Sequence, residues 1–202
     1  MHKIKPAILA AAVSVIYLQV EAARSAHAAL NMHIQSELGD IGKGENLTDV
    51  VVVKNDIDVF KYAVGEITSH LGLVGKSMDI HDVKSFLGVY GVQAGRAGNI
   101  LQKSTDYFAG KLELGAAGAI DELFMKPLEV VLAKADALYA TISIEGAMKS
   151  PAETYAAVTL AKRELGAAWG RVYSLGQEVL GLIEFGIAAD LKEIEKTRTL
   201  AA

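Results

Sequence analysis

The stretch DVVVVKNDIDVFKYAVGEITSHLG, residues 49–72, decides the fold class, because its four consecutive valines fit either a buried strand or a helix. A strand would need apolar residues at every second position, and this stretch does not keep that alternation. Its apolar residues instead recur at steps of three and four, as on one face of a helix. Those residues are Val50, Val53, Ile57, Phe60, Val64, Ile67 and Leu71. Because burying one valine contributes ~1.5–3 kcal/mol, more than its low helix propensity costs, we predict a helix.

The ends of this helix also have sequence signals. Thr48 and Asp49 are residue types that cap a helix N-terminus, and the charge of Asp49 suits the positive end of the helix dipole. Gly72 and Gly75 are expected to end the helix.

The same apolar period continues over residues 80–110 and 119–145, where Pro127 should kink the segment or start a new helix. The sequence Ser150-Pro151-Ala152-Glu153 is a capping box with proline at the first helical position. It predicts a helical region to about residue 197, which glycines could divide at Gly176, Gly181 and Gly186. We therefore predict an all-α protein, a five- or six-helix antiparallel bundle over residues 49–197.

The N-terminus has the features of a signal peptide. Two lysines precede 14 uncharged residues, AILAAAVSVIYLQV, and small residues suited to signal peptidase follow at Ala22 and at Ala28. The run is short for a membrane span, which needs about 20 residues. We expect residues 1–22 to be a signal peptide, with a membrane anchor as the alternative, and residues 23–48 to be a flexible segment.

Composition limits the possible partners and chemistry. The chain has 202 residues, a net charge of −4 and no cysteine. The negative balance argues against a nucleic-acid partner, whose phosphates need a basic face. The absence of cysteine excludes disulfides and thiolate metal sites. We also find no nucleophile–base pair and no histidine pair spaced for a metal, so we expect no enzyme activity, no metal and no cofactor.

The interior is expected to be aliphatic, because only 6% of the residues are aromatic while 51% are hydrophobic. Such an interior suits an apolar ligand, since binding sites are concave and mostly apolar. Glycines at 91, 95 and 98 either allow close helix packing or leave room for a ligand. Trp169 is either a core residue or a ligand contact. As ligand-binding candidates we choose the widest apolar side chains, which are Phe86, Tyr90, Phe108, Phe124 and Trp169.

Three stretches resemble the fungal hydrophobic surface-binding protein A family, which includes cell-wall mannoproteins. VVVVKNDIDVFKYAVGEITSHLG (residues 50–72) resembles the family's opening helix, GVQAGRAGNILQKSTDYF (residues 91–108) its alanine-rich second helix, and SIEGAMKSPAETYAAVTLAKRELGAAWGRV (residues 143–172) a later loop and helix. The resemblance implies a secreted, five-helix, non-enzymatic protein. It also implies adsorption to hydrophobic surfaces, recruitment of a secreted hydrolase, or capture of a fatty acid.

Two functions therefore follow as expectations. The first is an extracellular or cell-wall protein that binds hydrophobic surfaces or lipids, such as fatty acids, in or on an aliphatic bundle. The second is a membrane-anchored bundle that assembles with itself or with an envelope complex. Asn46-Leu47-Thr48 is a glycosylation sequon, which is meaningful if the chain is secreted by a eukaryote.

Overall fold

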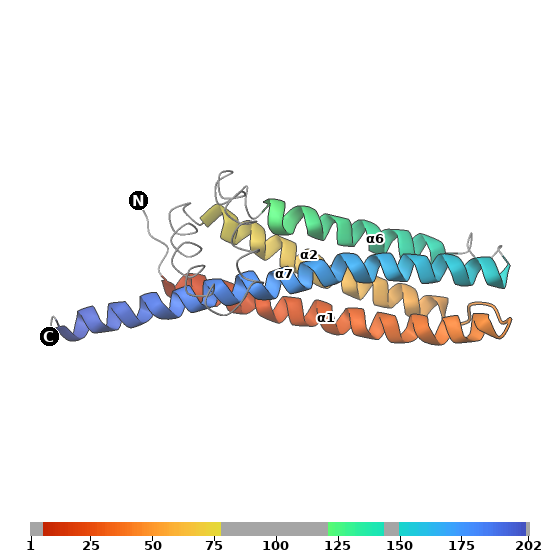
Figure 1. Cartoon of the computed structure of the whole chain (residues 1–202), viewed down its shortest axis with the longest axis horizontal. Coiled ribbons are helices and arrows are strands. Elements are labelled where there is room, and N and C mark those ends of the chain that lie inside the picture. The colour runs from red at the N-terminus through yellow and green to blue at the C-terminus, as the bar shows by residue number, and fades with distance from the viewer. Residues whose placement is uncertain (1–5, 78–120, 144–149, 201–202) are drawn as a thin grey trace, which may run out of the picture. The chain divides into compact units, whose positions relative to one another are not determined.

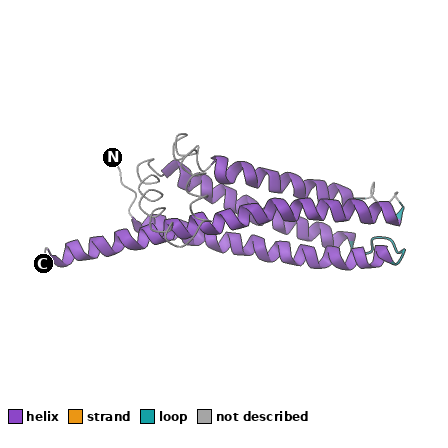
Figure 2. Ribbon diagram, viewed as in Figure 1, coloured by secondary structure: helices purple, strands orange, loops and turns teal. Residues whose placement is uncertain are grey.

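All regular secondary structure in the described residues is helical (Figure 2). The computed structural model describes residues 6–77, 121–143 and 150–200. These ranges contain four α-helices and one short π-helix: α1 (Pro6–Gly42), α2 (Val50–Ser77), η2 (Asp121–Met125), α6 (Lys126–Ile142) and α7 (Pro151–Leu200). The expectation of an all-α fold is confirmed. The count of five or six helices stays a prediction, because the helix expected at 80–110 lies outside the described residues.

The chain divides into two compact units. One comprises Met1–Tyr17, Ser69–Met125 and Leu175–Ala202, and the other comprises Leu18–Thr68 and Lys126–Ser174. We call the second the four-helix unit, because it contains parts of α1, α2, α6 and α7. Most of the described contacts between helices belong to this unit.

In the four-helix unit each helix runs antiparallel to its neighbours (Figure 1). Between α1 and α7, for example, Gln35 meets Lys162 while Glu21 meets Tyr173, so residue numbers rise along one helix as they fall along the other. Side-chain pairs join successive helices around the bundle: His33 with Asp56, Lys61 with Asp136, Lys134 with Glu164, and Lys162 with Gln35. The order around the bundle is therefore α1, α2, α6, α7, an up-down-up-down four-helix arrangement.

The core is built from apolar residues that repeat every seven positions, the spacing that keeps one seam of a helix against its neighbours. In α2 the predicted residues Val53, Ile57, Phe60, Val64 and Ile67 are all buried. In α6 the same steps of three and four select Leu128, Val131, Ala135, Leu138 and Ile142. Of the seven residues predicted to form the helical stripe of residues 49–72, six are buried, and Val50 at the start of the helix is half-buried.

Residues 23–42 differ from the expectation of a flexible segment, because they are the second half of α1. Their buried residues follow the same steps of three and four: Ala23, Leu30, Ile34, Leu38 and Ile41. The pattern is weak in the sequence because alanine and His27 occupy two of its inward positions. The stretch that connects α1 to α2 is limited to residues 43–49.

Helix ends follow the predicted signals in part. Ser150 and Glu153 form the predicted capping box, with the Ser150 amide 3.0 Å from the Glu153 carboxylate and the Glu153 amide 3.4 Å from the Ser150 hydroxyl. Pro127 lies in the first turn of α6, where its missing N–H is tolerated. Glycine, however, does not stop α2 or α7: α2 continues past Gly72 to Ser77, and α7 is one helix to Leu200. A glycine inside a helix destabilises it by only ~1 kcal/mol relative to alanine, which is not enough to end these long helices.

Two glycines near the end of α1 should have opposite effects on stability when they are replaced by alanine. Gly44 has φ +87°, a conformation that costs a side-chain-bearing residue ~1–2 kcal/mol. We expect Gly44→Ala to lower the free energy of unfolding by about 1 kcal/mol. Gly39 lies within α1, and a Cβ added there meets no atom within 4 Å, so Gly39→Ala should raise stability by about 0.5 kcal/mol. Urea unfolding of both variants tests this, and equal effects of the same sign would contradict it.

Candidate functional site

The predicted ligand-binding residues are distributed over different parts of the chain. Phe86, Tyr90 and Phe108 lie outside the described residues. Phe124 is buried in η2, and its ring lies 4.0 Å from the place that a Cβ on Gly176 would occupy. Trp169 is buried in α7, in the four-helix unit, whereas Phe124 belongs to the other unit. The role of these two residues in binding stays a prediction.

Trp169 belongs to an aromatic cluster that links three helices of the four-helix unit. Its ring lies 5.4 Å from the ring of Phe60 in an edge-to-face arrangement, with an interplanar angle of 88°. Tyr173, one turn along α7, is 6.0 Å from Trp169. Edge-to-face pairs at such distances stabilise by ~0.5–1.5 kcal/mol beyond their burial. Of the two roles considered for Trp169, its surroundings match that of a core residue.

His27 of α1 completes this cluster. Its imidazole centroid lies 5.4 Å from the ring of Phe60 and 6.3 Å from that of Trp169, both tilted. The side-chain amide of Asn31, one turn later, lies 3.2 Å from Nδ1 and 3.4 Å from Nε2. Burial lowers the pKa of His27 below the ordinary histidine value, and the charge of Lys162 lowers it further. The neutral imidazole is thus the form that the bundle favours.

The α1–α7 side of the cluster is polar. The hydroxyl of Tyr173 donates to Glu21 at 3.3 Å, and Glu21 also accepts a hydrogen bond from Arg24 at 2.7 Å. Lys162 donates to Gln35 at 2.9 Å, and Gln35 lies about two turns after His27 on α1. The aromatic cluster is therefore close to a water-accessible seam on one side.

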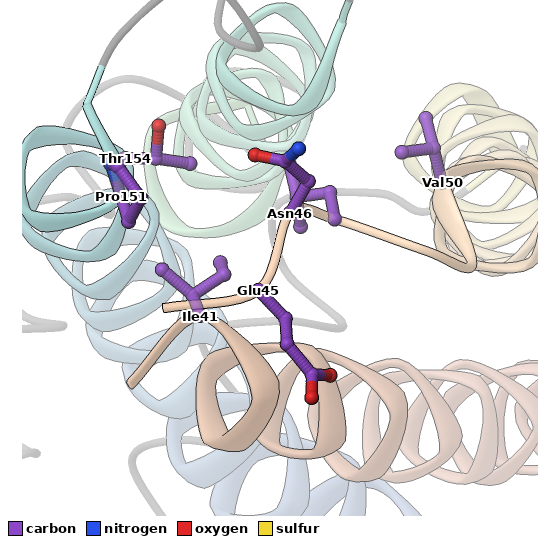
Figure 3. A pocket seen from close by; sticks show the side chains of 7 residues that line it. Ile41, Glu45, Asn46, Val50, Pro151 and Thr154 are labelled. Carbon is purple, nitrogen blue, oxygen red and sulfur yellow. The ribbon is translucent and has the colours of Figure 1, made fainter. Parts of the chain in front are cut away.

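A small pocket lies where the connection between α1 and α2 meets the start of α7 (Figure 3). Its volume is about 60 Å³. Sites for drug-sized ligands occupy ~300–1,000 Å³, so this pocket is too small for a fatty-acid chain. It is lined by Ile41, Glu45, Asn46, Leu47, Val50, Pro151 and Thr154.

Asn46 is exposed on this connection, beside the pocket (Figure 3). The connection is fixed by Glu37 of α1, a buried residue whose carboxylate accepts hydrogen bonds from the amides of Thr48 and Asp49 and from the Thr48 hydroxyl. Thr48 is thus the third residue of the sequon and also a partner of Glu37. Glycosylation of Asn46 stays a prediction.

An apolar surface lies on the outside of the α1–α2 pair. The contact between His33 Nδ1 and Asp56 Oδ2 sets the register of the two helices. Helix geometry puts the residues four before and three after each partner beside that contact, on its outer side. This spacing selects Ala29, Ser36, Val52 and Val59. We add the exposed Met32, which precedes His33, and the exposed Tyr62, one turn after Val59, and call these six residues the α1–α2 outer face.

The large side chains of this face are well exposed: Met32 is 64% exposed, Val59 50% and Tyr62 72%. The exposed side of α1 is also unusually low in charge. Between Arg24 and Asp40, α1 has only one acidic or basic residue besides its histidines, and this residue is the buried Glu37. The sequence prediction missed this face because it took residues 23–42 to be flexible. The absence of lysine and arginine from residues 25–39 was the signal that could have found it.

Comparison of the chain with protein-family models, with curated proteins and with solved structures gave no match. The resemblance to the hydrophobic surface-binding protein A family therefore stays a prediction. Within the described ranges, no helix combines the length and the apolar composition that crossing a membrane requires.

Proposed function

We propose that this chain is a non-enzymatic helical protein that binds hydrophobic surfaces through the α1–α2 outer face. The observation that supports it best is the exposure of Met32, Val59 and Tyr62 on a helix pair whose α1 side has almost no charge. Exposed apolar residues are ordinary when they are scattered singly, but a contiguous group marks an interaction site. Val59 and Tyr62 are one turn apart on α2, and the register set by His33 and Asp56 puts Met32 of α1 near their level.

In the part of the chain that the structure describes, adsorption on the outside has more support than capture of a fatty acid in the core. The inward residues of the described helices fill the interior, and Phe60, Leu30, Leu128 and Leu165 are each no more than 1% exposed. The pocket beside Asn46 is too small for an acyl chain. A fatty acid remains a second possible ligand, for which the apolar side chains of the outer face would serve as the contact.

The proposed location is extracellular or at the cell wall, where such a protein could also bring a secreted hydrolase to an apolar substrate. This part of the proposal rests on the signal-like residues 1–22. Intact-mass analysis of the protein secreted from a eukaryotic host tests it. Secretion with loss of the first 22 residues supports the proposal, and recovery of the full-length chain from membranes alone would reject it in favour of an anchored bundle.

The binding surface is tested by a matched pair of double variants. Met32→Lys with Val59→Lys places two charges on the outer face, whereas Val130→Lys with Leu160→Lys places two charges at comparably exposed positions on α6 and α7. We expect the first to weaken adsorption to polystyrene or octyl-coated beads by at least about tenfold, because each lost apolar contact removes ~1 kcal/mol or more. The second should adsorb like the original protein.

All four positions are exposed, so both variants should keep the helical content and thermal midpoint of the original protein, which circular dichroism verifies. Equal loss of adsorption in both double variants would show that overall charge matters and the face does not. Unchanged adsorption in the first variant would remove the outer face from the proposed function.

A further inference from the structure

The cluster of His27, Phe60 and Trp169 places a half-buried titratable ring against two buried aromatic rings of the four-helix unit. His27 occupies an inward position of the seven-residue repeat, between the buried Ala23 and Leu30. Its neighbours across the bundle are the Phe60 ring at 5.4 Å and the Trp169 ring at 6.3 Å. Leucine or isoleucine would fill this position without a polar atom, so the imidazole adds a property that packing alone does not need.

We propose that His27 is a pH-sensitive element of the fold, and that its protonation opens the seam between α1 and α7 and exposes the aromatic cluster. This inference stands apart from the proposed binding function, because it uses the interior of the bundle and none of the outer-face residues.

The hydrogen bond to Asn31 explains why the charged form fits poorly. The amide nitrogen of Asn31 is the atom nearest the ring nitrogens, and it can donate only to a ring nitrogen that has no proton. Imidazolium has a proton on both nitrogens, so it offers the amide nitrogen of Asn31 no acceptor, and Asn31 would have to turn its carbonyl oxygen toward the ring instead. The second N–H of the charged ring then needs a further acceptor, which water at the polar α1–α7 side can supply.

The surrounding charges do not compensate for an imidazolium. Lys162 of α7 repels it. Several other charged groups on the packed helices are already hydrogen-bonded within the bundle: Glu21 with Arg24 and Tyr173, His33 with Asp56, Lys61 with Asp136, and Lys134 with Glu164. Separation of α1 from α7 relieves the repulsion by Lys162 and admits water to His27 in the same step.

The direction of the pH effect follows from the depressed pKa of His27. The folded protein binds this proton more weakly than the unfolded chain, whose histidine titrates near 6.5. As the pH falls through that value, the unfolded chain takes up protons first, and stability decreases. The contribution of neutral His27 is therefore complete above about pH 6.5 and is lost on acidification. A competing effect is cation–π attraction to Phe60 and Trp169, which would favour the charged ring.

Trp169 makes the test direct, because it is the only tryptophan of the chain and lies within the cluster. The full chain is titrated from pH 8 to pH 5 while the emission maximum and acrylamide quenching of Trp169 are recorded. We expect a reversible shift of the emission to longer wavelength and stronger quenching, with a midpoint below 6.5. Wavelength and quencher access are the readouts, because imidazolium itself reduces tryptophan intensity without any opening.

Two variants test whether protonation of His27 causes the change in Trp169 emission. His27→Gln should abolish the shift, and His33→Gln, on the same helix, should keep it. Proton NMR of the original protein adds a measurement that needs no variant: the His27 ring should titrate below the ordinary histidine value, together with the Trp169 resonances. A shift that persists in His27→Gln, an emission that stays constant from pH 8 to pH 5, or a Trp169 that becomes better protected in acid would each overturn the proposal.

Discussion

Replacing Phe60 with alanine is expected to lower the free energy of unfolding of the four-helix unit by about 3–5 kcal/mol, the usual cost of removing a buried phenylalanine ring. Phe60 is fully buried on α2. Its ring lies 5.4 Å from both the imidazole of His27 and the ring of Trp169, so the substitution also removes the shared partner of those two rings. Because a domain is stable by only ~5–15 kcal/mol, this loss should leave the variant partly unfolded at 37 °C.

Urea unfolding followed by Trp169 fluorescence measures this loss next to the replaced ring. Tyr62→Ala is the matched control: it removes a ring of similar size from the same helix, but one that is 72% exposed, and it should change stability by no more than about 0.5 kcal/mol. If both variants lose the same stability, the inward assignment of Phe60 is wrong. If neither loses stability, the cluster does not stabilise the bundle.

The position of Phe60 shows which part of the fold is readable from the sequence. In residues 49–72 every third or fourth residue is strongly apolar, and the spacing alone selected the residues that are buried. The capping box at Ser150 was equally clear, because its two side chains act within one turn and need no tertiary context. Strong periodicity and local hydrogen bonds are thus sufficient to identify these elements.

Residues 23–42 show where this approach fails. Their inward positions include Ala23, His27 and Glu37, none of which is strongly apolar, so the helical period is hard to recognise. His27 acquires its role from Phe60 and Trp169, and Glu37 from the amides of residues 48 and 49. These partners lie on other elements or beyond the helix end, and no local pattern predicts them.

The candidate site was also only partly predictable. The prediction chose large aromatic residues as ligand contacts and expected them to face the interior. Trp169 is indeed buried, but its contact with a ligand stays a prediction. The exposure of Met32 and Val59 depends on which helices pair, and the His33–Asp56 contact that sets this pairing joins residues of two helices. An outer face can be derived only after the inner one is known.

Replacing Glu37 of α1 is the second change that should lower the free energy of unfolding substantially. Its side chain is only 3% exposed, and its carboxylate accepts the amide N–H groups of Thr48 at 2.8 Å and Asp49 at 3.2 Å. The Thr48 hydroxyl donates to it as well, at 3.2 Å. These donors lie at the N-terminus of α2, where the helix dipole also favours a negative charge. We expect Glu37→Ala to lower the free energy of unfolding by about 2–3 kcal/mol, because the three hydrogen bonds that its charged carboxylate accepts are lost.

Glu37→Gln separates the hydrogen bonds from the charge. Glutamine keeps one acceptor oxygen of the same reach but loses the charge, so it should cost about 1 kcal/mol, close to the value of a charge near a helix end. Glu45→Gln, in the exposed connection, is the control and should be nearly silent. Urea unfolding ranks the three variants, and amide hydrogen exchange at residues 48–53 should accelerate most in Glu37→Ala. Equal losses of stability for alanine and glutamine at position 37 would mean that the charge, and not the hydrogen bonds, stabilises the start of α2. An alanine variant as stable as the original protein would mean that water replaces the carboxylate at no cost. In that case α1 does not fix the start of α2.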